Sequence, residues 1–175
     1  MSSQTQTPAQ SEKTVTSVWP VILLTMICLI WAGMVMGISL LETPIKFTAP
    51  SLKQAVAPEI GRAIALDIGR VVFGAFNKVE IVWSVLTFGL MLGTGTFRRL
   101  SGIAKGLFVG LWAVVAFQSI VLVPALAERA QMVLNKQTLP PAPYHMLYTS
   151  TELFKLIALL TLGVMLLKLN SRSQA

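Results

Sequence analysis

Four long runs of apolar residues alternate with shorter polar segments along the chain. The runs lie at about 18–41, 71–94, 104–126 and 147–168. A hydrocarbon core about 30 Å thick is crossed by about 20 mainly apolar residues in an α-helix. The pattern therefore predicts an all-α, polytopic membrane protein, in which residues 18–168 form a four-transmembrane-helix bundle.

The segments outside these runs are polar or mixed. Residues 1–17 are rich in Ser, Thr and Gln and predict a disordered N-terminal tail, and residues 169–175 predict a short C-terminal tail. The segments 97–105 and 127–145 are predicted to be loops, basic and polar respectively. Pro58 is well placed to begin a helix. Charged and apolar residues alternate after it, which predicts an amphipathic lead-in to the second span.

Composition supports a membrane protein and argues against a nucleic-acid-binding one. Hydrophobic residues make up 54% of the 175 residues and charged residues 12%, against about 25% charged residues in a typical soluble domain. The net charge is +7, but the basic residues cluster between the apolar runs without an aromatic–basic module. We therefore expect the lipid bilayer as a partner and no nucleic acid.

The positions of the basic residues predict the orientation. Each side carries six of them, but on one side Arg98, Arg99 and Lys105 share a loop without acids, and Lys168 and Arg172 follow the last run closely. The opposite loops mix basic with acidic residues. Because basic residues close to span ends set the orientation, we expect an inner-membrane protein with both termini in the cytoplasm.

Two of the runs carry charges inside the predicted spans. The uninterrupted apolar part of the fourth run, 156–167, has 12 residues, or about 18 Å of helix. Since this length does not cross a core of about 30 Å, Glu152 and Lys155 are expected to lie inside the membrane. The same argument places Asn77 and Glu80 inside the second span.

These polar residues are expected to converge at one depth, in the extracytoplasmic half. Tyr148, Glu152 and Lys155 are spaced i, i+4 and i+7 and share a helical stripe. An isolated charge costs about 2.5–3.5 kcal/mol on insertion scales, so Lys155 should pair with Glu152 or with Glu80. The predicted polar pocket consists of Glu42, Arg70, Asn77, Glu80, Gln118, His145, Tyr148, Glu152 and Lys155.

Glycines predict where helices approach closely. G-x-x-x-G arrays, which permit such contacts, occur in three of the four runs and favour a tight bundle, a homo-oligomer or a membrane partner subunit. The glycines are Gly33, Gly37, Gly89, Gly93, Gly102, Gly106 and Gly110.

No motif indicates a metal, a cofactor or a nucleotide. Cys28 and the nearby Met26, Met34 and Met36 offer soft ligands for Cu(I), but they do not share a stripe and are ordinary apolar fillers. His145 has no Cys or His at zinc spacing, and the chain has no G-x-S-x-G, Walker or G-x-G-x-x-G motif. We expect no metal site and no cofactor.

A family resemblance is carried by WAGMVMGISLLETPIKFTAP, IALDIGRVVFGAFNKVEIVW and YHMLYTSTELFKL. These segments resemble the small four-helix membrane proteins of the transmembrane protein 205-like group, whose domain has no known function. The second helix is entered through Arg70 and Phe73, as in that group, while Tyr148 stands where the group leads us to expect a histidine. The resemblance covers 18–168 and implies a four-helix membrane fold without an established activity.

Two classes of function follow from this pattern. The first is a transport or accessory role, in which Glu80, Glu152 and Lys155 bind or relay a proton, a cation or a small polar solute. The second is a non-catalytic assembly subunit that packs against partners through its glycine faces. An intramembrane enzyme, with Glu152 or Glu80 as base and Tyr148 as acid, would lack a nucleophile or metal set, so we expect no enzyme. If the polar residues only join helices, each contact contributes about 0.6 kcal/mol, which offsets buried charges poorly.

Overall fold

The computed structural model describes residues 18–42, 45, 48, 58–138 and 141–172. Regular structure within these residues is entirely helical, so the predicted all-α class is confirmed. The predicted tail at 1–17, most of the connection at 43–57 and the last residues, 173–175, lie outside the described residues.

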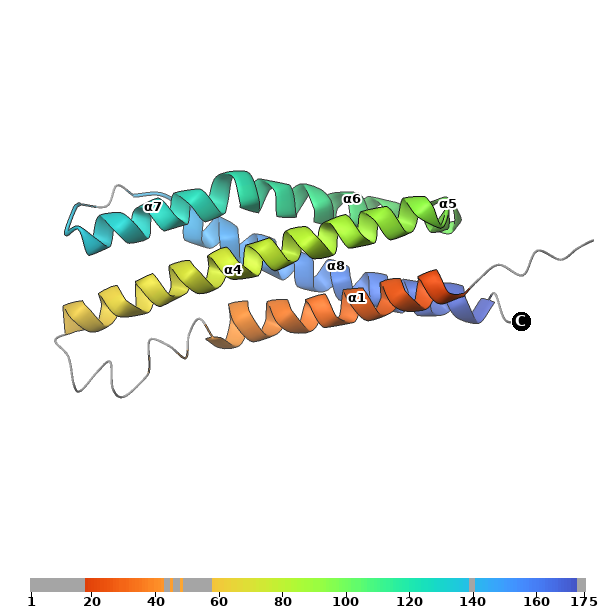
Figure 1. The fold of residues 1–175 in the computed structure, drawn as a ribbon, viewed down its shortest axis with the longest axis horizontal. Helices are drawn as coiled ribbons and strands as arrows, with labels where there is room; N and C mark the ends of the chain where they lie inside the picture. The colour runs from red at the N-terminus through yellow and green to blue at the C-terminus, as the bar shows by residue number, and fades with distance from the viewer. Residues whose placement is uncertain (1–17, 43–44, 46–47, 49–57, 139–140, 173–175) are drawn as a thin grey trace, which may run out of the picture.

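The long helices lie side by side and give the molecule an elongated shape (Figure 1). The start of α1, the end of α8 and the short α5 lie at one end. The start of α4 and the end of α7 lie at the other end, and α8 begins further in from it. In chain order the elements are α1 (Trp19–Val35), the π-helix η1 (Met36–Glu42), α4 (Pro58–Gly93), α5 (Thr96–Arg99), α6 (Gly102–Phe117), the π-helix η2 (Gln118–Leu122), α7 (Val123–Leu134) and α8 (Tyr144–Arg172).

Three stretches of the described chain are long and apolar enough to cross a membrane. They are Trp19–Ser39, Ala63–Gly93 and Gly102–Leu134. The fourth predicted span lies on α8, which is not among them, so a fourth crossing stays a prediction. The chain therefore has the build of a membrane-embedded protein with three candidate spans.

Local sequence explains several helix boundaries. Pro58 begins α4, and the amphipathic lead-in and the second span form one continuous helix. Gly95 adopts a left-handed conformation, with φ of 65°, in the turn between α4 and α5. Such a conformation suits a residue without a Cβ atom. The Ser101 side chain accepts a hydrogen bond from the backbone nitrogen of Ala104 at 3.3 Å and caps α6.

The predicted loop at 127–145 is wrong over its first half, because α7 continues to Leu134. The segment AERAQMVL consists mainly of residues with high helix propensity. α7 ends at Leu134, two residues before Lys136, whose φ is 54°. The preceding widening into η2 comes just before Pro124, which has no N–H to bond to the carbonyl group of residue 120.

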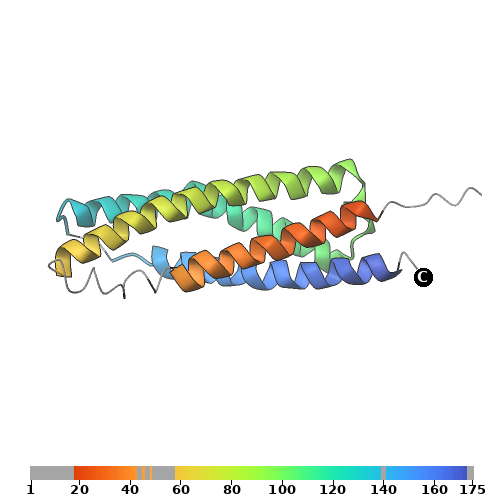
Figure 2. The same cartoon turned by 60° about the horizontal axis from the view of Figure 1, so that its bottom comes forward.

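The core runs along the axis between the helices. α8 lies along α1 in both views (Figures 1 and 2), while α4 packs against α6 and α7, and α6 against α8. The close approach of α1 and α8 is illustrated by Gly163, where an added Cβ would lie 3.1 Å from a methyl group of Leu29. The largest fully buried apolar side chains are Leu24, Trp31, Met91, Phe108, Leu111, Leu122, Leu159, Leu162 and Leu166.

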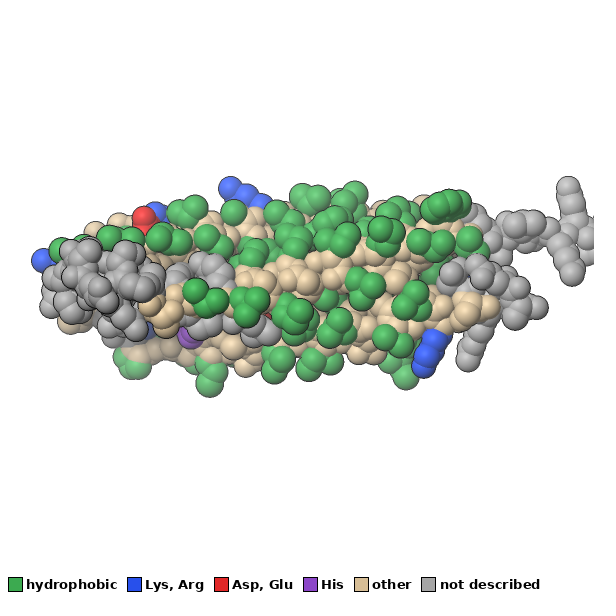
Figure 3. All heavy atoms as spheres, turned by 90° about the horizontal axis from the view of Figure 1, so that it is seen from below, with side chains coloured by type: hydrophobic (Ala, Val, Ile, Leu, Met, Phe, Trp, Pro, Cys, Tyr) green, Lys and Arg blue, Asp and Glu red, His purple; other side chains and the backbone are tan. Residues whose placement is uncertain are grey.

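The outer surface is apolar along the helices. Ile120 is 76% exposed, Ile103 72% and Val85 64%. Figure 3 shows hydrophobic side chains spread along the whole length of one face. Soluble monomers rarely expose contiguous apolar patches larger than a few hundred Å². This surface is suited to contact with lipid.

Candidate functional site

A buried charge cluster lies between α4 and α8. The Lys155 ammonium group of α8 donates to Glu80 Oε1 of α4 and lies 2.7 Å from Glu152 Oε1, one turn earlier on its own helix. Its nitrogen also lies 5.6 Å from the centre of the Phe76 ring. Lys155 and Glu80 have no exposed surface, and Glu152 is 2% exposed. Both pairings that the sequence allowed are therefore present, on one lysine.

Neutral donors from three further positions complete the cluster. Trp31 of α1 donates its indole N–H to Glu80 Oε1 at 3.0 Å. Ser39 of η1 donates to Glu152 Oε2 at 2.9 Å. The Gln118 amide of η2 donates to Glu152 Oε1 at 2.9 Å and to the Thr151 hydroxyl at 2.7 Å. Together with Lys155 of α8, donors from α1, η1 and η2 thus reach the same two carboxylates.

Both π-helices contribute directly to this site. η1 carries Ser39, and η2 carries Gln118 and Ser119. Ser119 accepts a hydrogen bond from the Asn77 amide at 3.0 Å. A π-turn rotates the following residues relative to an α-helix and occurs frequently at functional sites. Here it turns polar side chains of the first and third helical stretches towards α4 and α8.

Four buried polar atoms near these helices have no hydrogen-bond partner among the described residues. They are Glu80 Oε2, Ser84 Oγ, Gln118 Oε1 and the Tyr148 hydroxyl oxygen. Such unpaired groups are rare in protein interiors. Glu80 Oε2 is the carboxylate oxygen among the four, so this oxygen is where a proton or a further donor fits.

The predicted polar pocket is divided in the structure. Glu80, Gln118, Glu152 and Lys155 form the charge cluster, and Asn77 bonds to Ser119 beside it. Arg70, which was expected to join, instead forms an ion pair with Asp67, three residues before it, at 2.8 Å. Glu42 ends η1, but its side chain lies outside what the structure describes.

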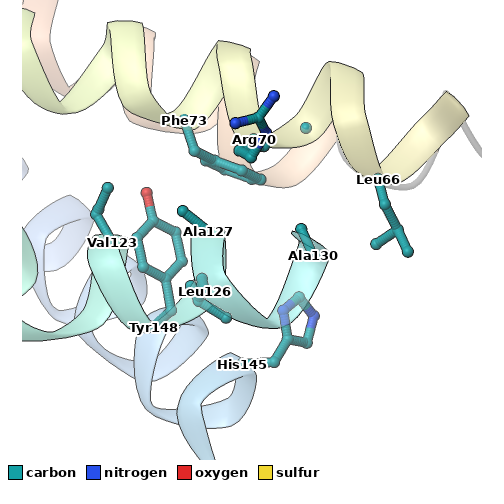
Figure 4. A pocket seen from close by; sticks show the side chains of 10 residues that line it. Leu66, Arg70, Phe73, Val123, Leu126, Ala127, Ala130, His145 and Tyr148 are labelled. Atoms are coloured by element: carbon teal, nitrogen blue, oxygen red, sulfur yellow. The ribbon is translucent and has the colours of Figure 1, made fainter. Parts of the chain in front are cut away.

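A second, mainly apolar pocket lies between α4, α7 and α8 (Figure 4). Among the residues that line it, Arg70 and His145 are exposed, and Tyr148 is buried. The Tyr148 ring meets Phe73 of α4 edge to face, with the ring centres 5.2 Å apart. Three residues of the predicted polar pocket therefore belong to this second site.

The glycine arrays face outwards within the described chain. An added Cβ would meet nothing within 4 Å at Gly33, Gly37, Gly89, Gly93, Gly102 or Gly106. At Gly110 it would lie 3.3 Å from the Phe154 ring. Most of these glycines therefore leave an open surface and do not separate two helices of the same chain.

The polar pocket predicted from the sequence did not include five members of the site: Trp31, Ser39, Phe76, Ser119 and Thr151. Trp31 could have been found, because a tryptophan in the middle of an apolar run needs a partner for its N–H group when it is buried. Thr151 adjoins Glu152 in sequence, but hydroxyl residues are common in membrane helices and carry little signal alone.

The chemistry available here is proton and hydrogen-bond exchange. Two buried carboxylates face one ammonium group, so full ionisation would leave one negative charge without a cation in the cluster. The described residues contain no group of three or more His, Cys, Asp or Glu side chains that could hold a metal ion. Cys28 is buried in the apolar core and not in this site. No family model matches the chain, and no curated protein or solved structure matches it.

Proposed function

We propose that the chain is a multi-pass inner-membrane protein whose cluster of Glu80, Glu152 and Lys155 binds and releases one proton in a transport or accessory role. The observation that carries the proposal is the sharing of one buried ammonium group by two buried carboxylates. Charged groups inside a membrane protein are costly, and they commonly mark ion or proton pathways.

The hydrogen bonds assign different tasks to the two carboxylates. Glu152 accepts from Ser39, Gln118 and Lys155 through both of its oxygens, so it suits the permanently ionised partner of the lysine. Glu80 has a bonded Oε1 and an unpaired Oε2. A proton on Oε2 neutralises the cluster, and its release restores a negative charge beside Lys155.

The proposal includes α8 as a fourth crossing, with both termini in the cytoplasm. α8 has 29 residues, about 44 Å of helix, and lies along the candidate span α1. Its charges at 152 and 155 are satisfied by protein groups and do not face lipid. Arg98 and Arg99 of α5 lie at the end where α1 begins and α8 ends, which supports a cytoplasmic end. This arrangement is compatible with the resemblance to the transmembrane protein 205-like group, which stays a prediction.

Infrared spectroscopy of the reconstituted protein tests the proton. We expect the wild-type chain to show the carbonyl band of one buried carboxylic acid, which shifts in D₂O and changes when the external pH is stepped. Glu80→Gln is expected to abolish that band, because glutamine holds no carboxyl proton. Glu128→Gln, which removes an exposed carboxylate on α7, should leave the band unchanged.

The same variants in liposomes that enclose a pH-sensitive dye test transport itself. A proton gradient should dissipate faster across liposomes that contain wild-type protein, alone or together with its co-transported solute, than across liposomes that contain Glu80→Gln. Absence of the acid band from wild-type protein, or its survival unchanged in both Glu80→Gln and Glu152→Gln, would overturn the proposed proton site.

A second function, assembly with another membrane helix, is supported by the outward glycines. Gly33 on α1 and Gly89 on α4 are exposed, with open space where a side chain would lie. Arrays of this kind allow helices of two chains to approach closely. The partner can be a second copy or a different membrane subunit.

Replacing Gly37 and Gly93 together by leucine distinguishes this role. We expect little change in the melting temperature of the monomer, because neither site packs against another part of the described residues. Any oligomer should weaken by about tenfold or more in its dissociation constant, since close helix approach is lost. Fluorescence energy transfer between labelled copies in vesicles measures this, and equal transfer in wild type and variant would exclude these glycines from an interface.

A further inference from the structure

An open groove lies where α1 begins and α4 ends. Its volume is about 240 Å³, more than the cavity of about 150 Å³ that holds a benzene ring in another protein. The groove therefore has room for several methylene groups of a chain. Its walls are apolar, and the residues that define this α1–α4 groove are Trp19, Pro20, Ile22, Leu23, Met26 and Leu90.

The position of the groove suits a lipid chain. Trp19 is the first residue of α1, and Met26 lies seven residues later, so the groove follows the first two turns, or about 10 Å, of a candidate membrane span. Trp19 is 74% exposed and Met26 54%. Because tryptophan is enriched at the membrane–water interface, the groove runs from that interface into the hydrocarbon core, where the first part of an acyl chain lies.

Basic residues without acidic neighbours lie at the same end of the molecule. α1 contains no acid, and α8 has none after Glu152. Between Glu80 of α4 and Glu128 of α7 the chain has none either. The exposed basic residues of the described chain at this end are Arg98, Arg99 and Lys168. Each basic residue near the membrane surface favours an anionic headgroup by about fivefold in affinity.

Tight turns keep the basic helix α5 beside the groove. The backbone nitrogen of Thr94 donates to the carbonyl group of Leu90 at 3.2 Å, and that of Arg98 donates to the carbonyl group of Gly95 at 3.1 Å. α5 therefore stays at the end of α4, just beyond the groove. The Lys105 ammonium group donates to the Arg98 carbonyl group at 3.5 Å, which holds a further cation against the same short helix.

We propose that the α1–α4 groove binds an acyl chain of an anionic phospholipid, whose headgroup is held by the basic residues of α5 and α8. The acyl chain packs along Leu23, Met26 and Leu90, and the headgroup lies at the level of Trp19, on the side of Arg98. A zwitterionic phospholipid fits the same groove but gains less from the cations. The inference rests neither on the proposed proton role nor on the side of the membrane that this end faces.

Native mass spectrometry of the full chain in detergent tests the headgroup, with phosphatidylglycerol and phosphatidylcholine of identical acyl chains as the two probes. We expect wild-type protein to bind phosphatidylglycerol about fivefold or more tightly, because only this lipid carries a net negative charge. The charge variant, Arg98→Gln with Lys168→Gln, should lose most of that preference. The control pair, Lys78→Gln with Lys136→Gln, removes two exposed lysines that lie away from this end and should keep it.

Filling the groove should weaken the binding of both lipids. Met26→Trp and Ile22→Phe each place a ring in it from a different position, so a folding defect in one variant leaves the other as a test. Leu160→Trp adds a ring at an exposed position of α8 outside the groove and should bind like wild type.

Four results would overturn the proposal. They are equal affinity of wild-type protein for the two lipids, a preference that survives in the charge variant, an equal loss of preference in the control pair, and undiminished binding by a folded variant with a filled groove. None of these outcomes affects the infrared test of Glu80.

Discussion

Replacing Lys155 by methionine is expected to lower the free energy of unfolding by about 3–5 kcal/mol, the usual cost of removing one partner of a buried ion pair. Methionine keeps the length and the apolar stem of the lysine but leaves Glu80 and Glu152 facing each other without a cation. Titration with SDS in mixed micelles, followed by circular dichroism, measures the loss.

Two further variants separate the lost charge from the lost packing. Lys78→Met removes an exposed lysine from α4 and should change stability little. Combining Lys155→Met with Glu80→Gln and Glu152→Gln removes every charge from the cluster and should recover a large part of the loss. If the triple variant is no more stable than Lys155→Met alone, uncompensated charge is not the cause of the destabilisation.

The convergence of charges could be predicted because membrane energetics leave few alternatives. Glu80 and Lys155 are 75 residues apart in the sequence, yet they meet since neither can face lipid cheaply. The length of the apolar segment alone predicted that Glu152 and Lys155 lie inside the membrane. The actual arrangement, with Lys155 bonded to both carboxylates, satisfies both pairings between which the sequence could not choose.

Counting residues at regular helical spacing does not predict which face a residue lies on where the helix is a π-helix and not an α-helix. η1 and η2 widen the turn, so the face on which Ser39 or Gln118 lies cannot be obtained by counting three or four residues from an apolar stripe. Spacing also gives a face but not a partner. Arg70 shares a stripe with Asn77 and Glu80, but near the end of the molecule it pairs locally with Asp67.

Short motifs gave the least information about direction. A G-x-x-x-G array indicates that one face of a helix lacks bulky side chains. It does not indicate whether that face contacts the same chain, another chain or lipid. Gly110 meets Phe154, while Gly33 and Gly89 meet nothing in the described chain. The contact that does bring two helices close, at Gly163, has no such motif around it.

The second large effect is an asymmetry between the two carboxylates. Glu152→Gln is expected to lower the free energy of unfolding by about 2–3 kcal/mol, because bonds to a charged acceptor are among the stronger ones and a buried amide would face existing donors. Glu152 accepts from Ser39, Gln118 and Lys155, and glutamine cannot accept from all of them with both terminal atoms.

Glu80→Gln is expected to change stability by about 1 kcal/mol or less, since a neutral glutamine resembles a protonated Glu80 in shape and charge. The amide oxygen can keep the bonds from Trp31 and Lys155 at Oε1, and the NH₂ group then occupies the place of Oε2, where no described donor lies. SDS titration of both variants beside wild type measures the difference. The reverse order, with Glu80→Gln the more damaging, would place the proton on Glu152 and make Glu80 the ionised partner of the lysine. Equal losses would mean that the two carboxylates share the lysine evenly, and the division of tasks between them would have to be abandoned.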